Sequence, residues 1–166
     1  MGVSLSQQDA ADLAERTEGW IAGLQLAGLS MQGRADPSAF IKGLSGSHRF
    51  ILSYLTEEVL ATQPANVQDF LLQTSILDEL CGELCDAVTG RTDSAALLER
   101  LWSSNLFLVP LDDEARWYRY HHLFADLLGG QLRRRLPGAA PELHRRASAW
   151  YEQRGMAAEA IEHSLA

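Results

Sequence analysis

The sequence predicts a mainly α-helical chain that contains one β-hairpin. Apolar residues recur at helical spacing along most of the 166 residues, and glycine, proline or asparagine separates the helical stretches. The exception is residues 106–120, where two short apolar runs lie on either side of an acidic turn, the pattern of a hairpin. With 46% hydrophobic residues, the chain can bury one core or two small ones.

Residues 1–47 are predicted to form a helical segment. A capping-box pattern begins at Ser6, and Pro37 suits the first turn of a helix. The predicted helices are residues 7–16, 18–32 and 37–44. Glycine flanked by two serines at 45–47 predicts a hinge between this segment and the next domain.

Residues 48–136 are predicted to form a winged-helix domain. The predicted elements are helices at 48–62, 65–74, 82–89 and 94–103, the hairpin at 106–120, and a last helix at 121–136. Successive helices, a two-stranded wing and a further helix, in this order, are the parts of a winged-helix domain. This inference rests on the order of the elements.

Residues 137–166 are predicted to be the start of a helical-repeat domain. Two prolines and a glycine make residues 137–141 a linker, and residues 149–161 match part of a tetratricopeptide-like pattern. A helical repeat does not bury its apolar face alone, so we expect the first helices of a tetratricopeptide-like superhelix and a chain that is a piece of a longer protein. The alternative is a lone helical pair that serves as a C-terminal clip.

The junction between the hairpin and the last predicted helix is the candidate site. From His121 onward the apolar spacing becomes helical, so His121 lies at a helix start. A helix start offers unpaired N–H groups and the positive end of the dipole, which suit a phosphate. A histidine there would tend to stay neutral and could donate one hydrogen bond. The alternative is a histidine that bonds the backbone at a domain joint.

Residues 120–128, YHHLFADLL, resemble the Met-His-Asp motif of STAND-type signalling ATPases. Nearly the whole chain resembles the middle region of the large MalT-like regulators of the LuxR family. The segments that carry this second resemblance are residues 17–27 (TEGWIAGLQLA), 46–50 (GSHRF), 54–60 (YLTEEVL), 70–77 (FLLQTSIL) and 105–112 (NLFLVPLD). His122 stands where the STAND motif has aspartate, so the role of that acid is not carried over.

The resemblance implies that His121 contacts the β-phosphate of ADP in a full-length parent protein. The parent would bind ATP and ADP in a preceding domain, while this segment itself holds no cofactor. Its implied partners are its own nucleotide-binding domain, a helical-repeat domain that reads an inducer, and further copies of the protein on activation. DNA would be bound only by a separate C-terminal helix-turn-helix. We therefore expect a bacterial, cytoplasmic regulatory segment that couples nucleotide state to inducer binding and self-assembly.

The sequence predicts no catalytic residues and no metal site, and hence no enzyme. There is no GxxxxGK[ST] loop for a triphosphate and no recognisable nucleophile–histidine–acid signature. His122 and Asp126 share a helical face, but no spacing supplies a third metal ligand. Cys81 and Cys85 are expected to be reduced thiols. No apolar stretch is long enough for a membrane span.

Two other functions remain open from the residues alone. One is a winged-helix module that reads DNA through the helix at 94–103. Against it, residues 1–115 hold 6 basic and 17 acidic residues, and the wing tip at 112–114 is acidic, so phosphates would be repelled. Residues 116–166, with 8 basic and 5 acidic residues, are the more basic part. The second alternative is a stand-alone helical adaptor for protein–protein interaction.

Overall fold

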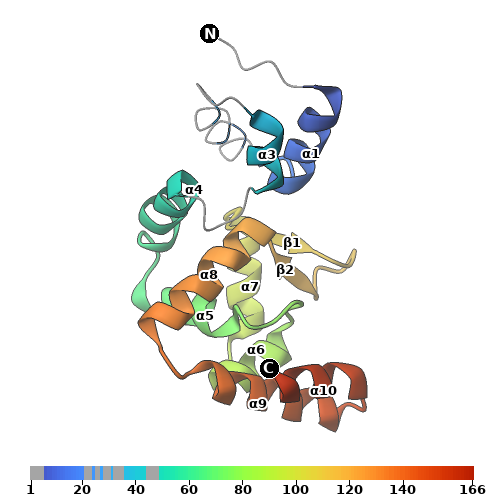
Figure 1. The fold of residues 1–166 in the computed structure, drawn as a ribbon. Helices are drawn as coiled ribbons and strands as arrows, with labels where there is room; N and C mark the ends of the chain where they lie inside the picture. The colour runs from blue at the N-terminus through green and yellow to red at the C-terminus, as the bar shows by residue number, and fades with distance from the viewer. Residues whose placement is uncertain (1–5, 21–23, 25–26, 28–30, 32–35, 44–48) are drawn as a thin grey trace. The chain divides into compact units, whose positions relative to one another are not determined.

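The computed structural model describes residues 6–20, 24, 27, 31, 36–43 and 49–166. The chain divides into two compact units. The first unit comprises residues 1–62 and 122–127, and the second comprises residues 63–121 and 128–166. Figure 1 labels the helices and strands of both units except η1, which follows α4.

The first unit is helical. Its elements are α1 (Gln7–Thr17), α3 (Pro37–Lys42), α4 (Arg49–Tyr54), the π-helix η1 (Leu55–Leu60) and the first residues of α8 (His122–Arg135). The Ser6 hydroxyl accepts a hydrogen bond from the Asp9 N–H at 3.1 Å, so the predicted cap of α1 is confirmed. The Asp36 carboxylate caps α3 in the same way, through the Ala39 N–H at 2.9 Å.

The predicted helix at 48–62 is wrong as a single α-helix. Residues 49–54 are α-helical, but residues 55–60 form a π-helix, closed by the Ala61 N–H on the Thr56 carbonyl at 2.9 Å. Most of the predicted helix at 18–32 and the whole hinge at 45–47 lie outside the described residues. Within that range, the described residues Ala27 and Met31 are buried, and Trp20 and Leu24 are half-buried.

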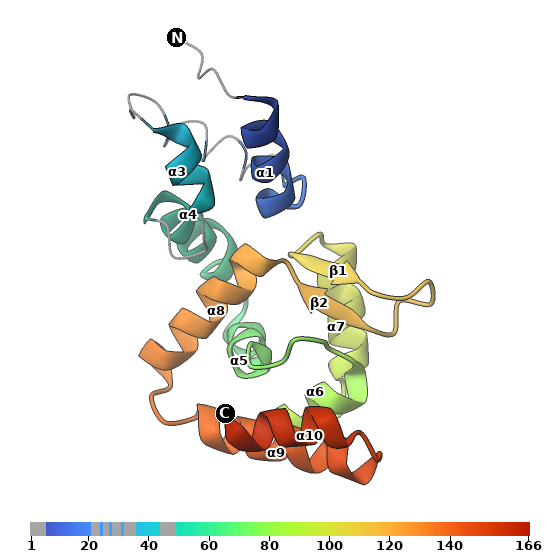
Figure 2. The ribbon, with the colours of Figure 1, turned by 45° about the vertical axis from the view of Figure 1, so that its right-hand side comes forward.

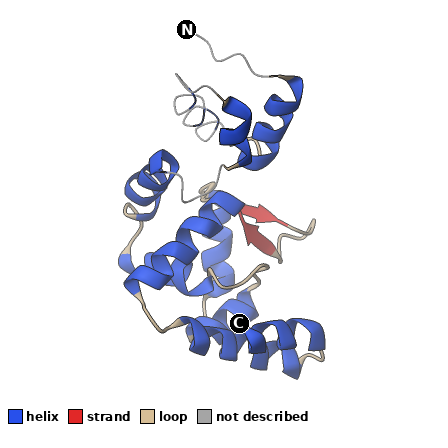
Figure 3. Ribbon diagram, viewed as in Figure 1, coloured by secondary structure: helices blue, strands red, loops and turns tan. Residues whose placement is uncertain are grey.

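The second unit contains the hairpin. Its elements are α5 (Ala65–Thr74), α6 (Gly82–Thr89), α7 (Ser94–Ser103), β1 (Leu108–Pro110), β2 (Tyr118–Tyr120), the rest of α8, α9 (Ala140–Gln153) and α10 (Ala157–Leu165). The sheet of the described residues has two strands, drawn red in Figure 3. The predicted bounds of the three helices α5, α6 and α7 are those observed.

The hairpin is antiparallel, with Leu108 opposite Tyr120 and Pro110 opposite Tyr118. On its other edge, β2 pairs with the loop before α6: the Leu80 N–H donates to the Tyr118 carbonyl at 2.7 Å, and the Tyr118 N–H donates to the Leu80 carbonyl at 2.9 Å. This bridge ties the wing to the start of α6. The prediction of a mainly helical chain with one small hairpin is confirmed.

Helices α9 and α10 form an antiparallel pair, visible in Figures 1 and 2, and α9 also packs against α6. The predicted linker at 137–141 is too long, because α9 already begins at Ala140 with Pro141 in its first turn. The inner faces are apolar, with Ala147, Trp150 and Ala160 buried. A tetratricopeptide-like superhelix, and the predicted domain boundaries at 47 and 136, stay predictions.

Candidate functional site

The predicted phosphate-sensing residue, His121, lies directly between β2 and α8. It follows Tyr120, the last residue of the strand, and precedes His122, the first residue of the helix. The His121 side chain is buried, with only 5% of the residue exposed. Its backbone N–H donates to the Phe107 carbonyl at 2.7 Å, just before β1. Because this N–H is engaged, any hydrogen bond that His121 donates to a ligand must come from its imidazole.

Phe107 adopts a strained conformation that serves the position of His121. Its φ is 55°, in the left-handed region that a bulky residue rarely occupies. This conformation directs its carbonyl to the His121 N–H, and its ring meets the imidazole edge to face at a centroid distance of 5.9 Å. The strained conformation of Phe107 thus holds both the backbone and the imidazole ring of His121. Sequence reasoning gave no signal for it.

Strand β2, which ends just before His121, is anchored to α5 through a buried hydrogen bond. The Thr74 and Tyr120 hydroxyls lie 2.7 Å apart, and the Thr74 hydroxyl donates to the Phe70 carbonyl at 2.8 Å. Since Thr74 has only one hydroxyl proton, Tyr120 is the donor between them. Burial raises the pKa of Tyr120, so its hydroxyl remains protonated and can donate. The residue before His121 is therefore held by a side-chain bond as well as by the sheet.

His122 is the first residue of α8 and belongs to the first unit. In the first unit its Nδ1 lies 3.2 Å from the Glu18 carboxylate. Glu18 ends α1 in the left-handed conformation, with φ of 48°, and its N–H bonds the last carbonyls of that helix. The contact joins residues 104 positions apart in the sequence, so no spacing pattern could have revealed it.

A groove of about 870 Å³ lies in the second unit against α7 and the wing. Three tryptophans line it: Trp102 from α7, Trp117 beside β2 and Trp150 from α9. Its acidic lining residues are Glu83, Glu99 and Glu114, and its basic ones are Arg116 and Arg154. The groove is aromatic and slightly acidic, which suits it poorly for a nucleic-acid backbone.

Helix α9 closes one side of this groove. The Arg154 guanidinium, in the residue that follows α9, lies 3.9 Å from the centre of the Trp150 ring and pairs with the Glu83 carboxylate. Trp117 meets Trp150 edge to face at 6.5 Å. In a DNA-reading winged helix, the recognition helix and wing must face the duplex. Here part of that face is in contact with α9.

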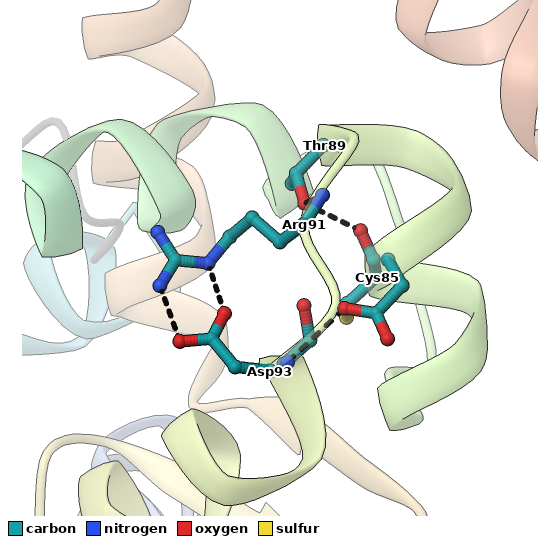
Figure 4. Close-up of polar contacts among 6 residues, drawn as sticks. Cys85, Thr89, Arg91 and Asp93 are labelled. Atoms are coloured by element: carbon teal, nitrogen blue, oxygen red, sulfur yellow. Dashed lines mark hydrogen bonds and ion pairs between the residues drawn. The ribbon is translucent and has the colours of Figure 1, made fainter.

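The turn between α6 and α7 is held by side chains (Figure 4). Arg91 pairs with Asp93 through two hydrogen bonds of 2.8 and 2.9 Å, and the Thr89 hydroxyl donates to the Cys85 carbonyl at 2.7 Å. The Asp86 carboxylate accepts from the first N–H of α7, that of Ser94, at 3.0 Å. These bonds fix the direction of α7 relative to α6. Because both helices line the groove, the bonds also fix the wall of the groove that the two helices form.

Comparison with known families agrees with this arrangement of helices and wing. Residues 56–140 match the MalT winged helix domain. The chain belongs to this family. The MalT winged-helix match contains α5 to α8, the hairpin and His121, and it ends at the first residue of α9. The predicted resemblance to MalT-like proteins is therefore confirmed.

Two curated relatives show how this MalT winged-helix region occurs in larger proteins. The chain is 40% identical over 165 residues to the serine/threonine-protein kinase PknK of Mycobacterium tuberculosis, covering 99% of this chain and 15% of that protein. It is 37% identical over 166 residues to the HTH-type transcriptional regulator MalT of Yersinia pestis, covering 98% of this chain and 18% of that protein. The chain thus spans less than a fifth of either relative.

None of the helices in the described part of the chain has the length and apolar character needed to cross a bilayer.

The structure brings His121 and Phe107 together, and His122 and Glu18, as set out above. Sequence reasoning missed the aromatic groove, although four tryptophans in 166 residues were a signal for aromatic surfaces.

Proposed function

We propose that this chain is a regulatory, non-catalytic segment of an ATP-dependent, MalT-like transcription activator of the LuxR family. Membership of the MalT winged-helix family supports the proposal, as does the 37% identity to a protein named as a transcriptional regulator. A protein named as a kinase shares the same segment at 40% identity. We therefore assign to the segment a regulatory role that a transcriptional regulator and a kinase can both use. It would carry out neither DNA binding nor phosphoryl transfer.

The observation that carries the proposal is the set of contacts around His121. Its backbone is fixed by Phe107, its preceding residue by Thr74, and its imidazole lies at the start of α8. Such a residue can supply one hydrogen-bond donor to the phosphate of ADP, while the remaining nucleotide contacts belong to a preceding domain of the parent. The fit is therefore that of a sensor and not of a complete nucleotide pocket.

In this mechanism the winged-helix segment acts as a latch. With ADP bound, His121 holds the segment against the nucleotide-binding domain of the parent. Exchange to ATP removes the contact and frees surfaces for self-association. A hydrogen bond to a charged group contributes about 1.5–3 kcal/mol, which biases a two-state equilibrium by about 10- to 150-fold. A bias of this size is sufficient to favour the ADP-bound state. It is also small enough for inducer binding at the helical-repeat domain to overcome.

DNA binding is assigned to a separate C-terminal helix-turn-helix of the parent. The acidic lining of the groove and the contact of α9 with the α6–wing face both disfavour a duplex at α7.

The latch is tested by His121→Ala in the full-length parent. We expect weaker ADP binding and a higher inducer-independent transcription, because the donor to the phosphate is lost. The matched control is His122→Ala, which removes the neighbouring histidine and its contact with Glu18. Reporter output is compared at equal protein abundance, measured by immunoblot. Unchanged basal transcription and ADP affinity in His121→Ala, or the same change in both variants, would refute the assignment to His121.

A further inference from the structure

Two histidines face each other across the helical pair at the C-terminal end. His144 lies on α9 and His163 on α10, and their Nδ1 atoms are 2.8 Å apart. The ring centroids are 5.0 Å apart and the ring planes are tilted by 41°. We propose that this pair binds a late first-row divalent metal ion, Ni(II) or Cu(II), through the two Nδ1 atoms. The site is independent of His121 and of the proposed nucleotide response.

The two nitrogens are close enough for one ion to reach both. With metal–nitrogen bonds of about 2.0 Å, two nitrogen ligands lie about 2.8 Å apart at a right angle and about 3.3 Å apart in a tetrahedron. The observed 2.8 Å is the length of the hydrogen bond between the rings, so both imidazoles must turn their lone pairs toward the ion when it binds. Imidazole ligands suit Cu(II) and Ni(II), and affinity for nitrogen sites is highest for Cu(II), which is why we name these ions.

Neighbouring contacts hold both rings in place. The Tyr151 ring stacks on the His163 imidazole at 5.5 Å with an interplanar angle of 11°. One turn along α9, the Ser148 hydroxyl lies 2.7 Å from the Ser164 hydroxyl and donates to the Ala160 carbonyl at 2.8 Å. These bonds tie α9 to α10 beside the histidine pair. A metal site needs such support, because ligands held in advance lose less entropy on binding.

The pair is chemically ready to bind a cation. Burial lowers the pKa of both His144 and His163, so both rings are neutral at pH 7 and keep a lone pair. The carboxylates of Glu162 and Asp78 raise the pKa of His163, but by less than burial lowers it. A cavity of about 360 Å³, lined by both histidines, gives an ion a path to the site.

Metal binding requires a change of tautomer but no net loss of protons. In the metal-free pair, one Nδ1 carries the proton of the hydrogen bond and the other accepts it. To bind a metal, both Nδ1 lone pairs must point at the ion, so the donor ring moves its proton from Nδ1 to Nε2. Each ring then remains neutral with one N–H at Nε2, and water completes the coordination.

The test is thermal unfolding of the chain, prepared without a histidine tag, in NiCl₂, CuCl₂, ZnCl₂ or MgCl₂. We expect the midpoint to rise with the logarithm of the metal concentration, most for Cu(II), then Ni(II), and least for Zn(II). Mg(II), which prefers oxygen ligands, should have no effect. A rise of equal size with Mg(II) would show binding to the acidic surface and overturn the proposal.

Single variants identify the ligands. His144→Asn and His163→Asn should each abolish the metal-dependent increase in the thermal midpoint. Both variants keep a polar side chain between α9 and α10. A third variant, His122→Asn, removes one member of the other group that could hold a metal ion, Glu18, His121 and His122, and should leave the increase in the thermal midpoint unchanged. Electron paramagnetic resonance of the Cu(II) form should show coupling to two nitrogens, and both variants should lose this two-nitrogen signal. A rise that survives both variants, or that only His122→Asn abolishes, would disprove the site.

Discussion

The crossing of α6 and α7 leaves no room for a side chain at Gly82. A Cβ added to this residue would lie 2.6 Å from the Ala95 Cβ and 2.9 Å from the Ala95 Cα. Neither atom belongs to a flexible side chain, so the helices themselves would have to move apart. The backbone of Gly82 is α-helical and not left-handed, so the cost of Gly82→Ala comes from this close approach alone.

We expect Gly82→Ala to lower the free energy of unfolding by about 1–3 kcal/mol, the usual cost of overpacking a close contact. The matched control is Gly129→Ala in α8, where the nearest atom to the added Cβ is the Arg133 guanidinium at 3.8 Å. There the same substitution should raise the free energy of unfolding by about 0.5–1 kcal/mol, because alanine favours the helix. The two substitutions therefore have opposite expected signs.

The measurement is urea unfolding followed by tryptophan fluorescence. Three of the four tryptophans, at positions 102, 117 and 150, lie in the second unit, so the signal reports mainly on that unit. With a slope of about 2 kcal/mol per molar urea, a loss of 2 kcal/mol lowers the midpoint by about 1 M. Ala95→Gly in the Gly82→Ala background should restore only part of the loss, since the added methyl group would still press on the backbone of residue 95. A neutral or stabilising Gly82→Ala would refute the close crossing.

Two further predictions concern titratable groups. Hydrogen bonds from Arg145 and Arg146 lower the pKa of Glu142 from 4.5 to about 2, so its contribution to stability is complete above pH 4.5 and is lost as pH falls toward 2. Thermal midpoints should therefore fall less between pH 5 and 2 in Glu142→Gln than in the wild type; parallel curves would contradict this. Burial raises the pKa of both Cys81 and Cys85, so a thiol reagent at pH 8 should modify half-buried Cys81 slowly and buried Cys85 only on unfolding. Equal rates in the folded protein would contradict the burial.

The helices of the second unit could be predicted from the sequence because their ends are marked by chemistry. Pro64 precedes α5, and Gly90 ends α6 with φ of 75°, a conformation that glycine adopts without strain. At Asn105, shortly after α7, φ is 54°, which asparagine tolerates better than most residues. Residues of this kind end a helix through their own backbone preferences and not through tertiary contacts. The helix ends can therefore be predicted from a single sequence.

The rest depended on contacts that no local pattern encodes. The single residue Leu80 bridges β2 without any alternation of its own, and the left-handed φ of Phe107 is offset by its bond to a residue 14 positions later. The π-helix at 55–60 has the composition of an ordinary helix. His144 and His163 are 19 residues apart on two helices, a spacing that matches no metal motif. Each of these features is decided by tertiary packing.

The winged-helix domain of this chain has the parts of a DNA reader, but its chemistry favours another role. Acidic groups line the groove beside α7, and the Arg154–Glu83 pair attaches α9 to the same face. At the opposite end of the hairpin, a strained residue and two buried bonds fix His121 at the start of α8. In the proposed latch, contacts of this kind keep one donor in register with a neighbouring domain, because a displaced donor would no longer distinguish two states of a ligand.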